Sequence, residues 1–197
     1  MADAATIVEQ APLQDQDLLQ RLSIYFDAFD SRLKKGQGWF IFNAAPGRSS
    51  RISGFIQARL GDHGASVSSC VVTWRDFALS AYVHEIGLPQ LAPEAEGARN
   101  DRVKHEYQLA QRVTKDTLDQ LVFSDLLVLV GLKPRQAHEA VFLDRTIDGR
   151  YRQRLATILL TPEMPEELAA DFATLDPTRT YWERLFSRMY ETSLVAL

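Results

Sequence analysis

The chain has 197 residues, 46% of them hydrophobic, which is enough for one ordinary domain with a substantial core. Its formal net charge of −4 gives no overall basic surface, so any contact with nucleic acid would need a local patch. The single cysteine, Cys70, excludes an internal disulfide, and no histidine or cysteine spacing indicates a metal site. The N-terminal residues lack a secretory pattern and no apolar run reaches about 18 residues, so we expect a cytoplasmic protein without membrane contact.

The spacing of apolar residues predicts helices and strands that alternate along most of the chain. A flexible arm is expected over residues 1–14, followed by a helix over 15–33 that begins at Asp15 or Asp17. The chain shows strand patterns at 39–42, 66–73, 125–132, 156–161 and 193–197, helical patterns at 49–60, 74–86, 102–123, 137–152, 166–172 and 177–189, and a surface loop at 88–100. Because right-handed crossovers place helices on both faces of a parallel sheet, we expect a three-layer α/β sandwich in which residues 15–197 form one domain.

A strand, a turn of small residues and a helix follow one another over residues 38–60, GWFIFNAAPGRSSRISGFIQARL. This geometry lets backbone N–H groups hold a phosphate, and Ser49 or Ser50 is placed to cap the helix. A Walker A loop reads GxxxxGK[ST]. On this chain its eight positions are Asn43, Ala44, Ala45, Pro46, Gly47, Arg48, Ser49 and Ser50. Asn43 and Arg48 therefore replace the two glycines, Ser49 replaces the lysine, and only the hydroxyl of Ser50 is retained.

Several stretches, in the same order, resemble the DnaC/IstB group of AAA+ ATPases, which contains bacterial helicase loaders and transposition ATP-binding proteins. The segment YFDAFDSRLKKGQGWFIFNAAPGRSSRIS resembles that family's approach helix, first strand and Walker A loop, and SCVVTWRDF its second strand. SDLLVLVGL stands at the place of the Walker B strand, LDRTIDGRYRQRLATILLTPEMPEEL at that of the sensor strand, and RLFSRMYE at that of the late arginine motif. The resemblance covers about residues 18–195. It implies a RecA/AAA+-like P-loop NTPase sheet of five parallel strands, in which the strand after the Walker A loop neighbours the sensor strand.

The resemblance also implies catalytic positions that this sequence does not fill. The Walker B acids, which hold Mg²⁺ and activate water, would fall at Val130 and Gly131, and the sensor Asn at Thr161 or Pro162. A charged hydrogen bond to phosphate contributes roughly 1.5 to 3 kcal/mol, so loss of the lysine alone would weaken nucleotide affinity about ten- to a hundredfold. We therefore expect no catalytic residue, no metal and no cofactor, with weak binding of ATP, ADP or another anion left open.

Arginines supply the remaining candidate contacts. Arg48 is either a substitute for the absent lysine at the helix start or a solvated residue of the turn. Arg184 and Arg188 match the family's arginine finger, and they either serve the structure or act in trans on an active partner ATPase. A basic patch near the end of the 137–152 helix either contacts single-stranded nucleic acid or is a solvated helix end. The patch comprises Arg145, Arg150, Arg152 and Arg154.

The leading hypothesis is a catalytically inactive binding and assembly protein. It would contact a helicase, a transposase or an active ATPase in DNA replication, transposition or another mobile-element process. One alternative is an ATPase switch or helicase loader that uses residues 48–50 with an acid borrowed from Asp125 or Glu139. A second alternative is a nucleic-acid-binding accessory that acts through the basic patch. The oligomeric state stays open, because AAA+ relatives assemble through the nucleotide interface that this sequence has lost.

Overall fold

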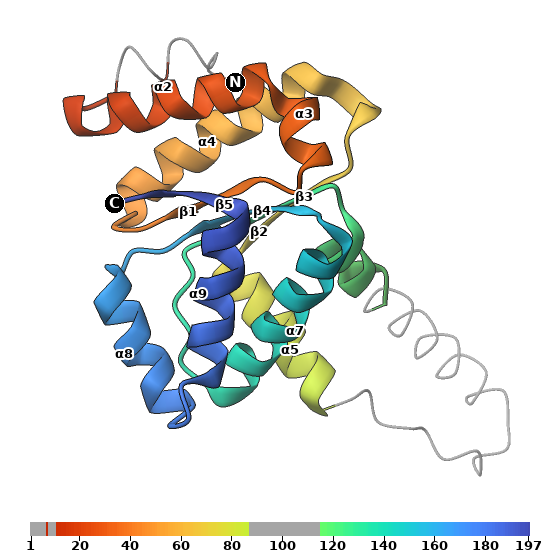
Figure 1. Cartoon of the computed structure of the whole chain (residues 1–197), viewed down its shortest axis with the longest axis vertical. Helices are drawn as coiled ribbons and strands as arrows, with labels where there is room; N and C mark the ends of the chain where they lie inside the picture. The colour runs from red at the N-terminus through yellow and green to blue at the C-terminus, as the bar shows by residue number, and fades with distance from the viewer. Residues whose placement is uncertain (1–6, 8–10, 87–114) are drawn as a thin grey trace, which may run out of the picture.

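The computed structural model describes residues 7, 11–86 and 115–197, and these form three layers around one parallel sheet (Figure 1). The sheet has five strands in the order β2-β3-β4-β1-β5. The strands are β1 (Gly38–Ile41), β2 (Ser69–Thr73), β3 (Leu126–Val130), β4 (Ala156–Leu160) and β5 (Ser193–Ala196). The predicted three-layer α/β architecture is therefore confirmed.

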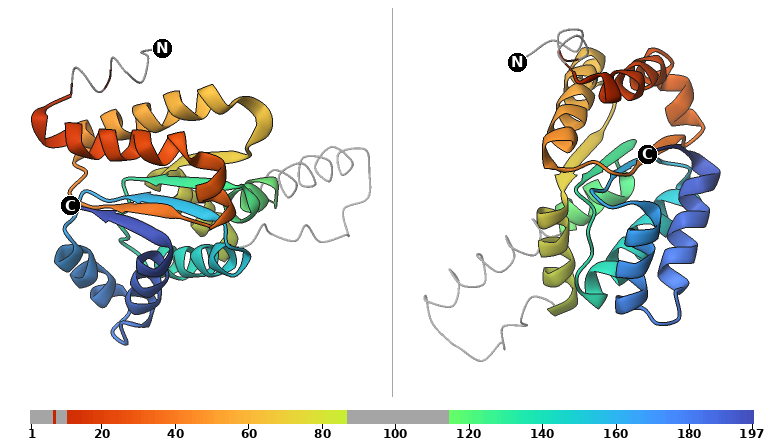
Figure 2. Two further views of the ribbon diagram at one scale, coloured as in Figure 1. Left: turned by 45° about the horizontal axis from the view of Figure 1, so that its top comes forward. Right: turned by 90° about the vertical axis from the view of Figure 1, so that its left-hand side faces the viewer.

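Helices cover both faces of the sheet, as Figures 1 and 2 show. One face carries α2 (Leu13–Asp27), α3 (Phe29–Lys34) and α4 (Pro46–His63), and a 3₁₀ turn (Gly64–Ser66) leads on to β2. The other face carries α5 (Trp74–Ile86), α7 (Ala137–Gln153), α8 (Pro165–Leu175) and α9 (Thr180–Thr192). Among the described helices, none combines the length and apolar composition that crossing a bilayer requires.

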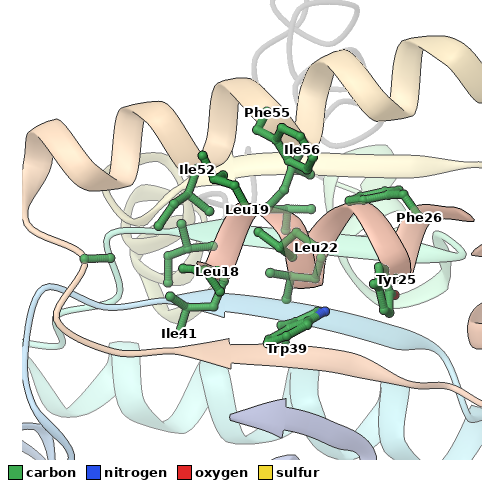
Figure 3. Close-up of a cluster of buried hydrophobic side chains, with 14 of the residues drawn as sticks. Leu18, Leu19, Leu22, Tyr25, Phe26, Trp39, Ile41, Ile52, Phe55 and Ile56 are labelled. Carbon is green, nitrogen blue, oxygen red and sulfur yellow. The ribbon is translucent and has the colours of Figure 1, made fainter. Parts of the chain in front are cut away.

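Two hydrophobic cores flank the sheet because successive strand side chains point to opposite faces. Trp39 and Ile41 belong to the core under α2 and α4, whereas Phe40 belongs to the core that α5, α7, α8 and α9 close. Figure 3 shows the first core, where Leu22 of α2 and Ile52 of α4 lie above the side chains of β1. All residues of β1 are buried, which confirms that this strand is covered on both faces.

Two helix starts differ from the prediction. The helix expected from Ser49 begins at Pro46, with Ala45 as N-cap, so neither Ser49 nor Ser50 caps it. Proline fits the first turn because the N–H that it lacks would have no helical partner there. The helix expected from Asp15 or Asp17 begins at Leu13 after Pro12, and Asp15 does not cap it but lies buried within its first turn.

The predicted neighbour of the sensor strand is wrong. The strand after the phosphate loop, β2, lies at the sheet edge and pairs with β3. The strand before the loop, β1, pairs with β4, with Phe40 opposite Leu159. Since β3 lies between β2 and β4, β2 does not reach the sensor strand.

Some predictions fall outside the described part of the chain. Residues 115–123 are helical, as expected for the end of the 102–123 helix. The rest of that helix, the loop at 88–100 and most of the arm at 1–14 lie outside the described residues.

Candidate functional site

A cleft of about 620 Å³ lies at the carboxyl ends of β1, β3 and β4, where open parallel sheets bind their ligands. The start of α4 contributes Ser49 and Ser50 to its wall, and the end of β3 contributes Val130 and Gly131. These residues are far apart in the sequence, and the fold brings the candidate phosphate loop and the candidate Walker B position to one cleft.

The phosphate loop itself offers few free donors. The N–H of Asn43 donates to the Glu163 carbonyl at 3.1 Å, and the N–H of Ala44 donates to the Thr161 carbonyl at 2.8 Å. Asn43 has a φ of 52°, in the left-handed region. Pro46, the first helical residue, has no N–H. Because a phosphate cradle is built from backbone N–H groups, this loop has lost donors to the end of β4 and to proline.

Arg48 turns away from the cleft toward α2. Its Nε donates to Oδ1 of Asp15 at 2.9 Å, and its Nη1 donates to the carbonyls of Phe42 and Asn43 at 3.3 and 3.0 Å. Its Nη2 donates to a C-terminal oxygen of Leu197 at 3.4 Å, and only 12% of the side chain is exposed. Both interpretations of Arg48, as a lysine substitute and as a solvated residue, are wrong, because a carboxylate and carbonyls of the chain already occupy its guanidinium.

Asp15 is the centre of this ion cluster. It is fully buried, and Arg51 donates to its Oδ2 through Nη2 at 2.5 Å and through Nε at 3.1 Å. A buried carboxylate needs such partners, and here two guanidinium groups supply them. The sequence reasoning missed this role. The available signal was an acid at position 15 on the stripe that continues with Leu18, Leu19 and Leu22.

The position of the Walker A lysine is filled by a hydroxyl without a partner. Ser49 is 5% exposed, and its Oγ has no hydrogen-bond partner within the described ranges. The cations of the cleft lie elsewhere in the wall, at Arg75, Lys133 and Arg135. Lys133 forms an ion pair with Glu163, and this hydrogen bond raises the pKa of the Lys133 ammonium. Sequence reasoning missed these cations, although two of them directly follow β3.

The end of β3 carries no acid. Gly131 has a φ of 80°, and its N–H and that of Leu132 both donate to the Leu160 carbonyl, at 2.9 and 2.8 Å. The hydroxyl of Thr161, the sensor candidate, is buried and donates to the Leu132 carbonyl at 2.8 Å. Pro162, the other sensor candidate, lines the cleft without a polar side chain. Neither Val130 nor Gly131, the two candidate Walker B positions, has a side chain that can ligate Mg²⁺.

The two acids considered as substitutes lie in different places. Asp125 directly precedes β3 at the amino-terminal end of the strand, opposite the cleft, where it accepts the N–H of Ser68 at 2.9 Å, so the prediction for Asp125 is wrong. Glu139 does line the cleft, but its Oε2 accepts the N–H of Arg135 at 2.8 Å. In the ranges that the structure covers, no group of three His, Cys, Asp or Glu side chains is placed to hold a metal ion.

Several solved structures share this architecture. The DnaC helicase loader matches with a TM-score of 0.61 and 14% identity, over 94% of this chain and 90% of that one. DnaI matches with a TM-score of 0.62 and 12% identity, over 98% of this chain and 92% of that one. A DNA replication initiation factor matches with a TM-score of 0.59 and 12% identity, over 96% of this chain and 48% of that one. The fold is AAA+-like. No protein-family model and no curated protein matches the sequence, and identities this low show the fold alone.

The basic patch of the AAA+-like chain is not a single surface. Arg150 is 1% exposed, and its guanidinium donates to Oγ1 of Thr157 at 3.0 Å and to the carbonyls of Leu121, Ser124 and Ala156 at 3.1, 2.9 and 2.5 Å. Burial lowers the pKa of Arg150 to about 10. The proposed contact of Arg150 with nucleic acid is therefore wrong, because the side chain joins α7 to β4 inside the protein.

The other arginines of the patch are exposed. Arg152 pairs with Asp148 at 2.9 Å with 75% of its side chain exposed. Arg154 ends α7 with a φ of 56°, and Arg145 lies on the outer surface of the same helix. The helical spacing carried a signal for this difference, because Arg150 stands three residues after Ile147 and seven after Leu143, which are buried on the same helix.

The arginine-finger candidates are engaged within the chain. Arg184 donates to Oδ2 of Asp144 at 2.7 Å, and Arg188 donates to Oδ1 of Asp144 at 3.2 Å and to Asp148. These ion pairs join α9 to α7. Arg188 has 17% of its side chain exposed and Arg184 has 43%, so Arg184 is the more accessible of the two.

Proposed function

We propose that this AAA+-like chain is a pseudo-ATPase, a binding and assembly protein that contacts a protein partner without turning over ATP. The observation that carries the proposal is the pairing of Arg48 with Asp15 beside a cleft whose β3 end lacks acids. Phosphoryl transfer depends on a metal ion held by acids and on cations that grip the phosphates. The cleft supplies neither in the expected places.

The fold supports a role in DNA replication or in a related mobile-element process. The DnaC helicase loader and a DNA replication initiation factor share it. A helicase, a transposase or an active ATPase is the class of partner that such a protein would contact. Affinity capture from the host that encodes the chain, followed by mass spectrometry, tests this class. Recovery of one of these proteins supports the proposal, and recovery of nucleic acid alone favours a nucleic-acid-binding accessory that uses the exposed Arg145, Arg152 and Arg154.

Absence of turnover is tested with the purified chain and Mg-ATP. We expect phosphate release at the level of a protein-free blank, and no change in nucleotide affinity when Arg48→Ala removes the loop arginine. An active AAA+ ATPase assayed in parallel controls for the reagents. Micromolar binding of ATP together with release of phosphate would contradict the proposal.

A second candidate function, a nucleotide-responsive switch without hydrolysis, is favoured by the cleft cations. Lys133, Arg75 and Arg135 line the same cleft as the hydroxyl of Ser49, which has no partner among the residues that the structure describes. Cations and a free donor are what a phosphate group requires. Calorimetric titration with ADP tests this function. Saturable binding that Lys133→Met weakens and Arg152→Met leaves unchanged supports the switch, and absence of saturable binding excludes it.

A further inference from the structure

The strand β5 leaves one side of the sheet open. It pairs with β1 at the end of the sheet, and no strand lies on its other side within the described residues. The carbonyl of Ala196 accepts the N–H of Phe42 at 2.9 Å, so Ala196 faces β1. Because backbone groups alternate along a strand, the N–H and C=O of Val195 face the outer edge. An edge of this kind is a template for another strand.

The side chains of β5 do not protect this edge. Proteins usually protect an open edge with a short strand, with lysine or proline, or with a bulge. The strand reads SLVA, and its side chains Leu194 and Val195 are 37% and 41% exposed. The strand is short, with four residues, but it carries no charged residue and no proline, so its outer edge is open to an extended segment of a partner.

A groove beside β5 has room for one side chain of such a partner. The groove has a volume of about 220 Å³, below the roughly 300 to 1,000 Å³ typical of sites for small molecules. It therefore fits a side chain of a docked segment better than a cofactor. It lies between α2 and β5, and its wall includes Arg21, Ile24, Arg32, Trp39, Leu194 and Val195.

The polar groups of the groove are donors that lack strong acceptors. Arg32 donates to Oε1 of Gln37 at 2.5 Å and has no carboxylate partner in the described part of the chain. Arg21 pairs with Asp17 at 3.0 Å, but these side chains are 59% and 71% exposed and easily exchange partners. In a chain of net charge −4, these two arginines make the groove locally basic, which favours an acidic ligand.

We propose that a partner protein docks an extended acidic segment along β5, which adds a sixth strand to the sheet. Main-chain hydrogen bonds to Val195 would supply affinity, an apolar side chain would fill the groove, and carboxylates would pair with Arg21 and Arg32. This inference rests on the proposed function as a protein-binding module and specifies its docking surface. It does not depend on the nucleotide cleft, so ATP turnover by the chain would refute the pseudo-ATPase proposal and leave this one standing.

The experiment uses the full chain and two labelled peptides of eight residues. One alternates valine or isoleucine with glutamate, and the control has the same apolar residues with lysine. Fluorescence anisotropy at low salt gives the affinities, and hydrogen exchange of residues 193–197 reports strand addition. We expect the glutamate peptide to bind at least tenfold more tightly than the lysine peptide and to slow exchange in β5.

Three variants locate the binding. Arg32→Glu should lower the affinity for the glutamate peptide at least tenfold and raise the affinity for the lysine peptide. Val195→Pro removes the outward N–H without touching the bonds to β1 and should abolish binding of both peptides. Arg152→Glu, on α7, should change neither affinity.

Circular dichroism confirms that each variant is folded, and Arg32→Glu keeps the test decisive if Val195→Pro unfolds the protein. No binding of the glutamate peptide, equal affinity for both peptides, or binding that survives Arg32→Glu would overturn the proposal.

Discussion

Asp15 of α2 accepts a hydrogen bond from Nε of Arg48 in α4 at 2.9 Å, across the core between the two helices. Arg48 occupies the second glycine position of the Walker A pattern, next to the place where an active loop presents its lysine to phosphate. The acceptor here is a carboxylate of the chain itself. The same interaction therefore removes a cation from the cleft and fixes the first helix to the phosphate loop.

Replacement of Asp15 by alanine should destabilise the protein by about 3 kcal/mol, because it leaves two guanidinium groups without their buried carboxylate. Urea denaturation followed by circular dichroism measures the change. Asp17→Ala is the matched control, since Asp17 lies on the same helix with 71% of its side chain exposed. We expect that control to stay within about 0.5 kcal/mol of the wild type. Equal stability of the Asp15→Ala protein and the wild type would contradict the structural role given to this ion cluster.

Replacement of Arg150 by methionine should cost about 3 kcal/mol or more, because the buried carbonyls of Leu121, Ser124 and Ala156 lose their donor. Arg152→Met removes a neighbouring arginine that is 75% exposed, and it should change stability by less than about 0.5 kcal/mol. Thermal unfolding of both variants distinguishes a buried structural arginine from a member of a surface patch. If Arg150→Met left the stability unchanged, Arg150 would again be interpreted as a member of the surface basic patch.

Tyr25 should make stability depend on pH in the alkaline range. Its hydroxyl donates to the Gln37 carbonyl at 2.7 Å, and burial raises its pKa above the ordinary value of about 10. Above pH 10 the unfolded chain loses this proton while the folded chain keeps it, so the stability that Tyr25 contributes is complete below about pH 10 and is lost as the pH rises further.

The comparison with Tyr25→Phe isolates this contribution. The variant should be less stable than the wild type by about 1 kcal/mol at pH 8, because it lacks the hydrogen bond. The difference should shrink by pH 11. Urea denaturation at the two pH values measures it, with Tyr190→Phe, which alters an exposed ring, as control. A difference that is the same at both pH values would show that Tyr25 titrates normally in the folded protein.

Gly38 should not tolerate a side chain. A Cβ at this position would lie 1.8 Å from the carbonyl oxygen of Thr157 in the paired strand β4, so Gly38→Ala forces β1 and β4 apart. We expect a loss of more than about 3 kcal/mol, in the range of severe overpacking. Gly54→Ala, inside α4 with no atom within 4 Å of the new Cβ, should instead stabilise the protein by about 0.5 to 1 kcal/mol. Denaturation curves measure both changes. If the two variants shifted the curve in the same direction, the close contact predicted for Gly38 would be contradicted.

The sequence by itself determined most elements of the fold and the residue types at the positions that the resemblance assigns to catalysis. The apolar run of β3 and the stripe of α2 are local patterns, and the side chains of Val130 and Gly131 offer no metal ligand.

Only the tertiary structure decided what the charged residues do. Asp15 and Arg48 are 33 positions apart, and Arg150 bonds to carbonyls 29 and 26 positions before it, so no local pattern could pair them. An arginine in a sequence has the same charge whether it meets solvent, phosphate or a buried carboxylate. Its partner is set by which helix faces pack together and by the need to neutralise every charge that this packing removes from water.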